Sequence, residues 1–393
     1  MSWLYRHCVR PFLFLQESEA VHGRTVRALG TIGRRPVLCK LMAGMYRAPE
    51  MPAEVFGLKF PNPLGLAAGM DKQALAVPSW EAMGFGFCEL GGVTWHPQSG
   101  NPGPRAFRAV PDQALINRMG SNNPGAIAFA EKLAQWRARG RWPKHPVGIN
   151  LGKSKLTPLE KAAEDYANTF RALWSHGDFF VVNLSSPNTP GLHQLQEKSR
   201  LGDILTALQQ VNADHAKKAA AAWAGPNEDA RLPTSAGTPA SRLKPILIKV
   251  APDLAFEALD EILELVGPRQ IAGIVATNTT VTRPQASSRG LQRVYAELGG
   301  LSGKPLRQRS TEVVRHLYRQ TQGTLPIIGV GGIFTAEDAW KKVTAGATLL
   351  QVYTGLVYEG PSLARDVVRG LQRKLQDIGL SDLRQAVGIT SRI

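Results

Sequence analysis

The chain has 393 residues, 43% of them hydrophobic, which excludes wholesale disorder and allows one large α/β barrel with an appendage or two ordinary domains. Its three cysteines lie far apart and form no C-x-x-C pair or Cys/His cluster, so we expect a reducing compartment and no metal site. The formal charge of +16 suits nucleic acid, an anionic membrane surface or anionic small ligands, and does not choose among them.

Residues 1–50 combine apolar and aromatic side chains with excess positive charge, 8 − 3 = +5 from Lys and Arg against Glu. The apolar run 11–15 is too short for a signal peptide or a membrane span. Ser18 is a candidate N-cap for one helix, and a further helix carries the apolar residues of 37–45. Short cationic amphipathic helices are typical of interfacial membrane anchors, although a helical hairpin packed on the main domain has the same pattern.

From Pro52 onward, apolar runs alternate with segments that favour helix. Residues 53–60, with a turn at Gly57, predict a short antiparallel element. Eight runs then predict buried strands, at 63–68, 87–94, 147–151, 179–184, 246–250, 271–277, 326–330 and 348–353. Helices are expected between most of them, for example at 123–140, 157–176, 256–266, 310–320 and 336–345. This order predicts a (β/α)₈ TIM barrel. A doubly wound sheet is the alternative, which the lack of G-x-G-x-x-G after the first strand disfavours.

We therefore expect a helical extension at 1–50, a barrel at 51–375 and a tail at 376–393. An insertion interrupts the barrel at 214–244, where the alanine run 219–222 precedes several Gly and Pro residues and little apolar material. We expect this insertion to be solvent-exposed, partly mobile and without a chemical role.

Functional groups of a barrel gather at the carboxyl ends of its strands. The stretch 179–191 passes from a buried strand into a loop with Asn183, Ser186 and Asn188, which suit a planar heterocycle, although a self-capping strand end would look similar. Other strand ends carry A-A-G-M-D-K at 67–72, I-N-R-M-G-S-N-N at 116–123, Asn150, Lys249 and T-N-T-T at 277–280. G-V-G-G at 329–332 and Y-T-G at 353–355 predict a cradle for a phosphate-bearing cofactor. The histidines are scattered without ligand spacing and are interpreted as surface or structural residues, with His22 left open.

Together, A-A-G-M-D-K, I-N-R-M-G, G-I-N-L-G-K, N-L-S-S-P-N-T-P-G, I-K-V-A-P-D-L, A-T-N-T-T, G-G-L-S-G-K-P-L and I-I-G-V-G-G-I resemble the class 2 dihydroorotate dehydrogenase family, over about residues 10–370. Ser186 stands where other classes carry a cysteine base. The resemblance implies oxidation of (S)-dihydroorotate to orotate in pyrimidine biosynthesis, with FMN as hydride acceptor and ubiquinone or another membrane quinone as final acceptor. It also implies a monomer on the cytoplasmic face of a bacterial inner membrane, with no nucleic-acid partner.

The resemblance further assigns roles to residues. Ser186 is implied as the catalytic base, under a loop around Thr189 and Pro190 that keeps the site dry. FMN would be held by Ala68, Gly69, Met70, Asp71, Lys72, Gly92, Asn150, Asn183, Lys249, Thr277, Gly303, Gly332, Tyr353 and Thr354. Dihydroorotate would be held by Lys72, Asn117, Arg118, Met119, Gly120, Ser121, Asn183, Asn188, Asn278 and Thr279. His22, Arg108 and Tyr353 would line the end of a quinone tunnel. Gly92 and Ser121 depart from the family, which commonly has Thr and Phe there.

Two other functions fit parts of the sequence. An FMN barrel that reduces uridine in RNA would suit the positive charge. By resemblance, however, that reaction uses a cysteine as the acid, and no cysteine of this sequence lies in a suitable strand-end loop. A membrane-surface binder that keeps the barrel only as a scaffold is the other alternative. The presence of Lys72, Ser186 and Lys249 argues against it.

Overall fold

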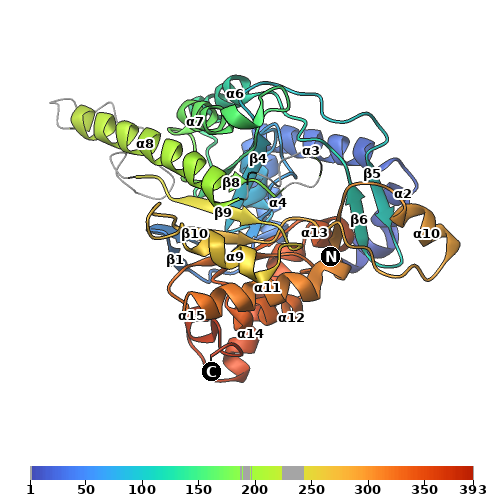
Figure 1. Ribbon diagram of the computed structural model, residues 1–393. Helices are drawn as coiled ribbons and strands as arrows, with labels where there is room; N and C mark the ends of the chain where they lie inside the picture. Colours follow the sequence, from blue (N-terminus) through green and yellow to red (C-terminus); the bar gives the residue numbers. More distant parts are fainter. Residues whose placement is uncertain (1, 186–187, 189–194, 196, 224–242, 393) are drawn as a thin grey trace.

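Eight parallel strands close into a barrel within the computed structural model, which describes residues 2–185, 188, 195, 197–223 and 243–392 (Figure 1). The strands are β3 (Leu64–Leu66), β4 (Phe87–Val93), β7 (Val147–Leu151), β8 (Phe179–Asn183), β9 (Ile246–Val250), β10 (Gly273–Ala276), β12 (Ile327–Val330) and β13 (Leu349–Val352). They pair in this order, and β13 pairs with β3 to close the ring. Each strand lies in one of the eight apolar runs, so the predicted barrel is confirmed and the doubly wound sheet is excluded.

Aromatic rings fill the interior of the barrel. Phe87 on β4 and Phe179 on β8 are fully buried and meet edge to face at 6.1 Å between ring centroids. A Cβ on Gly65 or Gly148 would lie within 2.4 Å of one of these rings, so glycine on the neighbouring strands leaves the space that they occupy. Most strand residues are apolar on both faces, because the outward face of the barrel packs under the helices.

The surrounding helices are α5 (Val77–Ala82), α6 (Ala126–Ala138), α7 (Ala162–Leu173), α8 (Lys198–Trp223), α9 (Phe256–Leu263), α11 (Arg307–Gln320), α12 (Ala336–Ala345), α13 (Thr354–Glu359) and α14 (Leu363–Asp377), with α10 (Arg289–Tyr295) and α15 (Leu383–Ala386) further out. The five helices predicted as examples are present. The segment 214–223, which we placed at the start of a solvent-exposed insertion, forms the end of α8, which extends away from the barrel (Figure 1). Residues 224–242 lie outside the described part.

Two small sheets accompany the barrel. The antiparallel pair β1 (Ala53–Val55) and β2 (Leu58–Phe60) matches the element predicted at 53–60, and its buried side chains join the interior cluster of the barrel. A second antiparallel sheet contains β5 (Ala106–Ala109), β6 (Ala114–Asn117) and β11 (Gly300–Gly303), in the order β11-β6-β5. It was not predicted, and it carries Asn117, Ser302 and Gly303 to the carboxyl ends of the barrel strands.

The extension consists of α1 (Ser2–Leu4), the π-helix η1 (Tyr5–Val9), α2 (Arg10–Phe14), α3 (Ser18–Arg34) and α4 (Pro36–Tyr46). The expected helices are present, but the N-cap of α3 is Glu17 and not Ser18, because the Glu17 carboxylate accepts hydrogen bonds from the N–H groups of Glu19 and Ala20. Within the described residues, every helix is too short or too polar to cross a bilayer.

Hydrogen bonds attach the extension to the barrel. The Tyr5 hydroxyl donates to the Val357 carbonyl at 2.8 Å and Arg10 donates to the Tyr358 carbonyl at 3.0 Å, both on α13. At the other end of the sequence, α14 continues to Asp377, so the tail that we expected from residue 376 begins inside this helix. The tail then lies along α12, where Gly388 N donates to the Val343 carbonyl at 3.0 Å.

Candidate active site at the carboxyl ends of the barrel

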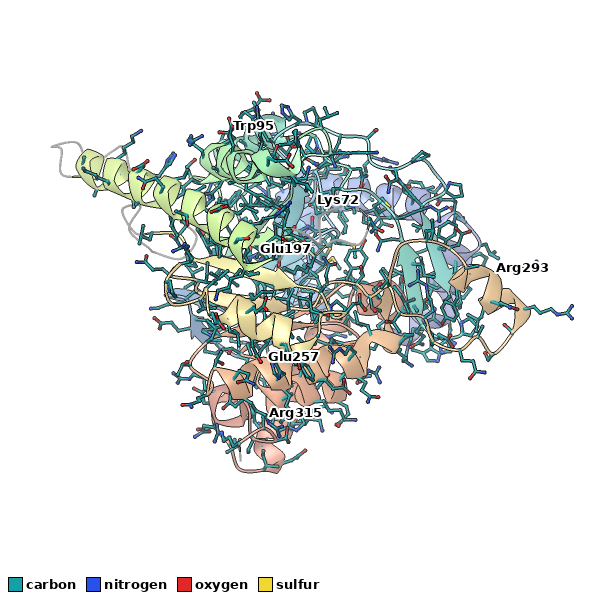
Figure 2. All side chains as sticks on the ribbon, viewed as in Figure 1. Lys72, Trp95, Glu197, Glu257, Arg293 and Arg315 are labelled. Atoms are coloured by element: carbon teal, nitrogen blue, oxygen red, sulfur yellow. The ribbon has the colours of Figure 1, made fainter. Side chains whose placement is uncertain are left out.

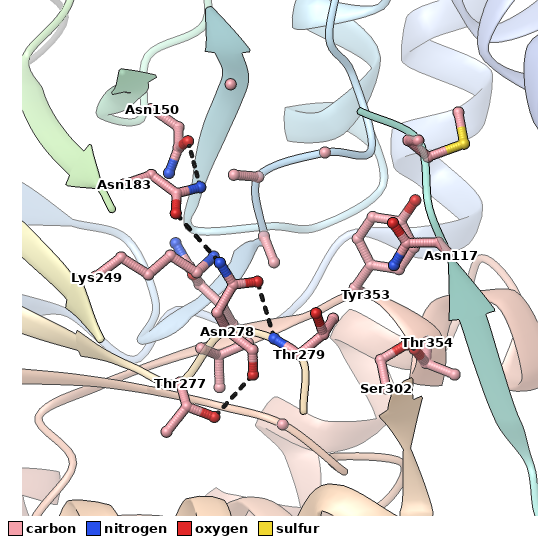
Figure 3. Close-up of a pocket in the computed structure, with 18 of the residues that line it drawn as sticks. Asn117, Asn150, Asn183, Lys249, Thr277, Asn278, Thr279, Ser302, Tyr353 and Thr354 are labelled. Atoms are coloured by element: carbon pink, nitrogen blue, oxygen red, sulfur yellow. Dashed lines mark hydrogen bonds between the residues drawn. The ribbon is translucent and has the colours of Figure 1, made fainter. Parts of the chain in front are cut away.

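A pocket lies at the carboxyl ends of the strands, and all eight strands contribute to its wall (Figure 3). In strand order these contributions are Ala68, Gly92, Asn150, Asn183, Lys249, Thr277, Val330 and Tyr353. Position at the strand ends brings together side chains that are almost 300 residues apart in the chain, as the barrel rule predicts. The pocket is therefore the candidate active site.

Three carboxamides in this pocket form a directed chain of hydrogen bonds, which Figure 3 shows. Asn183 Nδ2 donates to Asn150 Oδ1 at 3.0 Å, and Asn278 Nδ2 donates to Asn183 Oδ1 at 3.1 Å. The Thr279 N–H completes the chain by donating to Asn278 Oδ1 at 2.8 Å. Each amide thus has its donor and acceptor ends fixed, so the chain holds the carboxamides in one orientation.

Glu89 on β4 is the acceptor at the end of this chain of hydrogen bonds. It is fully buried inside the barrel, where its carboxylate accepts from Asn150 Nδ2 and from Gln351 Nε2, each at 2.6 Å. Because a carboxylate offers only acceptors, it forces the Asn150 oxygen toward Asn183. Sequence analysis missed Glu89 and Gln351, although one glutamate in F-C-E-L-G-G-V and one glutamine in L-L-Q-V were the available signals.

Three lysines line the pocket, namely Lys72, Lys153 and Lys249. Lys249 on β9 is buried, and among the described residues its ammonium has no hydrogen-bond acceptor. Lys72 is half-buried, whereas Arg293 projects from the edge of the molecule (Figure 2), and Lys72 donates to Asn122 Oδ1 at 2.8 Å. Burial, and then repulsion from Arg105, lowers the pKa of Lys72 to about 8, while Glu19 acts in the opposite direction.

The glycine-rich loop after β12 lies along one side of the pocket. Gly331, Gly332 and Ile333 line it, and in the described part of the chain the N–H groups of Gly332 and Ile333 have no acceptor. Gly332 has a φ of +72°, and a Cβ there would lie 2.5 Å from Cβ of Arg307. Only glycine fits this position, and the free N–H groups form a potential anion site.

A second, mainly apolar cavity of about 490 Å³ separates the extension from the barrel. His22, Arg108 and Tyr353 line it together with apolar side chains of α2, α3 and α4. Burial, reinforced by the charge of Lys72, lowers the pKa of His22 to about 4, so this imidazole is neutral near pH 7. The two cavities share a wall, formed by Gly69, Lys72, Asn117, Met119, Ser302 and Tyr353.

Most of the residues predicted to hold FMN or dihydroorotate line the polar pocket at the strand ends, but three of the described ones do not. Met70 lines the second cavity instead. The buried Asp71 carboxylate accepts from the N–H groups of Leu75 and Ala76 and from the Trp80 indole, so it organises the turn into α5. Arg118 turns away to pair with Glu297 at 2.5 Å. Asp71 and Arg118 therefore support the site from behind and line neither cavity.

Part of the predicted site lies outside the described residues, including Ser186, Thr189 and Pro190. The neighbouring Asn188 is described, and its Nδ2 donates to Asn117 Oδ1 at 3.2 Å. Lys153, Ser302 and Gln351 line the pocket without having been predicted. Ser121 lines it with a φ of +54°, which is uncommon for a residue with a side chain.

The closed barrel and the polar pocket at its carboxyl ends define a (β/α)₈-barrel enzyme. Residues 51–375 match the family model described as dihydroorotate dehydrogenase, and the chain belongs to that family of oxidoreductases. It is 48% identical over 391 residues to the dihydroorotate dehydrogenase (quinone) of Gloeobacter violaceus, and 46% identical over 399 residues to that of Nostoc punctiforme. Both alignments cover 98% of each chain.

Comparison with solved structures also supports membership of this family. The chain is similar to the crystal structure of the Eimeria tenella dihydroorotate dehydrogenase in complex with ferulenol, with a TM-score of 0.84 and 34% identity over 96% of both chains. The ligand-free form of the same enzyme gives a TM-score of 0.82 and 35% identity over 96% of this chain and 100% of that one. The family resemblance drawn from the sequence motifs is therefore confirmed.

Proposed function

We propose that this protein oxidises (S)-dihydroorotate to orotate in de novo pyrimidine synthesis, with FMN as hydride acceptor and a membrane quinone as final electron acceptor. The observation that carries the proposal is the shared wall of two cavities of different character. One is polar and lies at the strand ends, and the other is apolar and lies under the extension. Such an arrangement suits a redox cofactor that meets a polar substrate and an apolar acceptor at different faces.

The residues present fit FMN. The N–H groups of Gly332 and Ile333 lack an acceptor within the described chain, as does the Lys249 ammonium. The buried Gln351 Oε1 also has no hydrogen-bond partner there. A phosphate suits the first pair of donors, and a heterocycle with polar edges suits the others. When bound, FMN supplies a ring that takes up hydride and then gives its electrons to the acceptor.

The side chains of this protein would carry out the remaining work. Lys249 would stabilise the negative charge that develops beside it, and Lys72 would pair with the carboxylate of dihydroorotate. The fixed carboxamides of Asn117, Asn183, Asn188 and Asn278 would orient the pyrimidine ring. By family resemblance, Ser186 would remove the proton from C5 of dihydroorotate.

Stopped-flow absorbance tests this function. We expect the purified, detergent-solubilised protein to be yellow, to bleach on anaerobic mixing with dihydroorotate and to recover its colour with a ubiquinone analogue. A colourless protein, or a flavin that ignores dihydroorotate, would refute the proposal and favour the RNA or scaffold alternatives. RNA binding that weakens steeply with salt would support the former.

We expect the affinity for dihydroorotate to fall as pH rises through about 8. The pKa of Lys72 is about 8, so below this pH the side chain is protonated and can pair with the substrate carboxylate. Above it, the free protein loses this charge, so KM should rise by roughly tenfold per pH unit. The measurement is KM from pH 6 to 9.5 for the wild type and for Lys72→Arg, whose guanidinium stays charged. A wild-type KM that does not change with pH would contradict this role.

The apolar cavity would receive the quinone, with its polar head near His22, Arg108 and Tyr353. Arg108 donates to the Gln16 carbonyl at 2.7 Å, and its guanidinium lies 4.6 Å from the centre of the Phe14 ring, so it also holds the end of α2 in place. A neutral His22 can donate one hydrogen bond to a carbonyl without introducing a charge into an apolar cavity.

The extension would bind the membrane surface, on the cytoplasmic face of a bacterial inner membrane. Nine of the 17 exposed large hydrophobic side chains in the described part lie between Trp3 and Met45. Phe12 is 70% exposed and Leu15 is 85% exposed, beside a net charge of +5 over residues 1–50. Exposed apolar residues flanked by cations suit an anionic lipid surface.

We expect Leu15→Asp to weaken binding to anionic vesicles by about tenfold, because it removes one inserted apolar side chain and adds repulsion. Leu156→Asp is the matched control, since Leu156 is 81% exposed but lies outside the extension, in the segment between β7 and α7. Co-sedimentation with phosphatidylglycerol vesicles measures both variants. Equal losses in the two variants would show that the extension is not the binding surface.

A further inference from the structure

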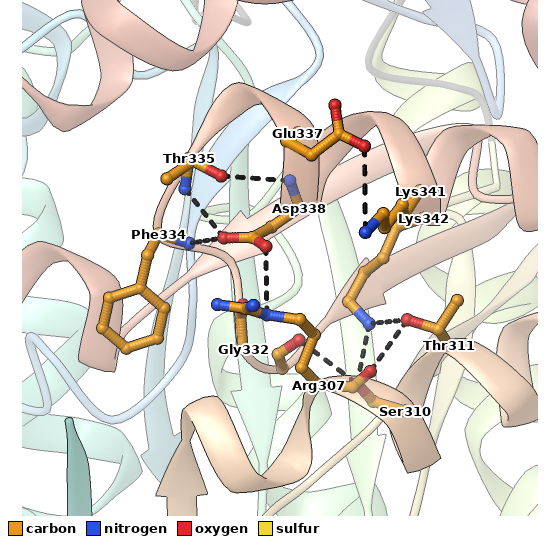
Figure 4. Close-up of polar contacts among 11 residues, drawn as sticks. Arg307, Ser310, Thr311, Gly332, Phe334, Thr335, Glu337, Asp338, Lys341 and Lys342 are labelled. Atoms are coloured by element: carbon orange, nitrogen blue, oxygen red, sulfur yellow. Dashed lines mark hydrogen bonds and ion pairs between the residues drawn. The ribbon is translucent and has the colours of Figure 1, made fainter. Parts of the chain in front are cut away.

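Lys342 on α12 is a fully buried cation in the layer behind the glycine-rich loop (Figure 4). Its ammonium donates to Ser310 Oγ at 2.7 Å and to Thr311 Oγ1 at 3.0 Å, both on α11. Within the described residues, no carboxylate lies at ion-pair distance from it. A buried ammonium with only hydroxyl partners is costly, so its presence calls for an explanation.

Ser310 connects this ammonium to the loop. Ser310 Oγ accepts from Lys342, so its own hydrogen is directed elsewhere, and it lies 3.1 Å from the carbonyl oxygens of both Arg307 and Gly331. A Cβ on Gly329 would lie 3.3 Å from Cδ of Lys342, so the lysine stem passes close over the end of β12. The side chain is therefore packed directly against the loop that borders the pocket.

Arg307 binds the carbonyl of Gly332, the residue that follows Gly331 in the loop. Its Nε donates to the Gly332 carbonyl at 2.9 Å and lies 3.0 Å from the Asp338 carboxylate. Asp338 also accepts from the N–H groups of Phe334 and Thr335, each at 3.0 Å, and so fixes the end of the loop. Because Asp338 neutralises Arg307, the positive charge that remains behind the loop is that of Lys342.

These contacts determine where the loop N–H groups point. In a planar trans peptide, the C=O and the following N–H point in opposite directions. With the carbonyls of Gly331 and Gly332 turned toward α11, the N–H groups of Gly332 and Ile333 turn the other way, toward the pocket that they line. Ser310 and Arg307 thus orient the N–H groups of Gly332 and Ile333, which lack an acceptor in the described chain.

We propose that Lys342 is a positioning residue for the cofactor phosphate, which holds the glycine-rich loop through Ser310 and supplies positive charge behind its N–H donors. The inference rests on the proposed use of FMN. It explains why the ammonium has no paired carboxylate, since the phosphate dianion would balance its charge across the loop. Without the phosphate, burial lowers the pKa of Lys342 to about 7. The charge of Arg307 lowers this pKa further, and that of Asp338 raises it.

Comparison of FMN with riboflavin, which lacks the phosphate, tests this inference without measuring activity. The flavin-free protein is titrated with each flavin and quenching of flavin fluorescence is followed. We expect Lys342→Met to weaken FMN binding by about tenfold, the effect of a single charge interacting across several Å, and to leave riboflavin binding unchanged. Lys341→Met is the matched control, because Lys341 is an exposed neighbour whose ammonium lies 3.8 Å from Glu337. It should bind both flavins as the wild type does.

Ser310→Ala provides a second test, since it keeps the charge and removes the connecting hydroxyl. It should reduce FMN affinity by a smaller factor, again without effect on riboflavin, and it carries the test if Lys342→Met does not fold. An equal loss of affinity for both flavins would indicate a merely structural role and overturn the inference. Unchanged FMN affinity in both variants would also overturn it. If the wild type binds neither flavin, the proposed function itself fails, and the inference falls with it.

Discussion

Replacing Ser186 by alanine should slow the bleaching of the flavin by dihydroorotate by about a thousandfold at neutral pH, because a positioned base contributes about 10² to 10⁴ to a proton transfer. Dihydroorotate would still bind, since Lys72 and the carboxamides that would hold it are unchanged. The loss should therefore appear in the rate of bleaching at saturating substrate and not in the substrate concentration that gives half the maximal rate. Anaerobic stopped-flow absorbance measures both quantities.

The adjacent Ser185 provides the control for this experiment. Its hydroxyl lies 2.9 Å from Asn278 Nδ2 and 3.2 Å from Asn183 Oδ1, so it belongs to the hydrogen-bond network and does not line the pocket. Ser185→Ala should lose one or two network hydrogen bonds and slow bleaching by roughly tenfold. If the two variants were equally slow, the assignment of the base to Ser186 would be wrong.

The barrel could be predicted because strands buried on both faces leave continuous apolar runs in the sequence. The run 147–151 matches β7 residue for residue, although it includes the polar Asn150 at its carboxyl end. Once eight such runs had been counted, the barrel rule placed Asn150, Asn183, Lys249 and Thr277 around one pocket. That placement required no knowledge of tertiary contacts.

The elements that escaped prediction depend on contacts between distant segments or on competing local signals. The sheet of β5, β6 and β11 pairs residues 114–117 with 300–303, and neither short segment has a periodic pattern of its own. The end of α8 was assigned to the insertion because the alanine run at 219–222 was grouped with the Gly and Pro residues after it. Alanine has the highest helix propensity, which should have favoured helix up to that point.

Buried charges inside the barrel and behind the glycine-rich loop were the main omission. In the sequence, Lys342 is the second of two adjacent lysines on an amphipathic helix, where solvent exposure is the default expectation. Only packing distinguishes it from Lys341, because α11 covers one side of α12 and not the other. Glu89 escaped for a related reason, since the strand that contains it was interpreted as apolar throughout.

Replacing Lys249 by methionine should slow flavin bleaching by about a hundredfold or more, the usual cost of removing one preorganised group that stabilises developing charge. The structure supports this size of effect because Lys249 is buried and its ammonium faces the pocket without an acceptor in the described part. A cation in such a place makes negative charge on a neighbouring ring less costly. The reduction potential of the bound flavin should therefore become more negative in Lys249→Met, as measured by equilibration with a reference dye.

Lys153→Met separates this effect from a general change of charge. Lys153 also lines the pocket and carries the same charge, but its ammonium donates to the carbonyls of Ser154 and Thr157 and is thereby directed into its own loop. Its removal should leave the flavin potential unchanged and lower the thermal stability of the protein instead, because one buried and one partly buried carbonyl lose their donor. If both variants shifted the potential equally, only the net charge of the pocket would matter. A shift confined to Lys249→Met would assign the effect to the position of this one ammonium at the end of β9.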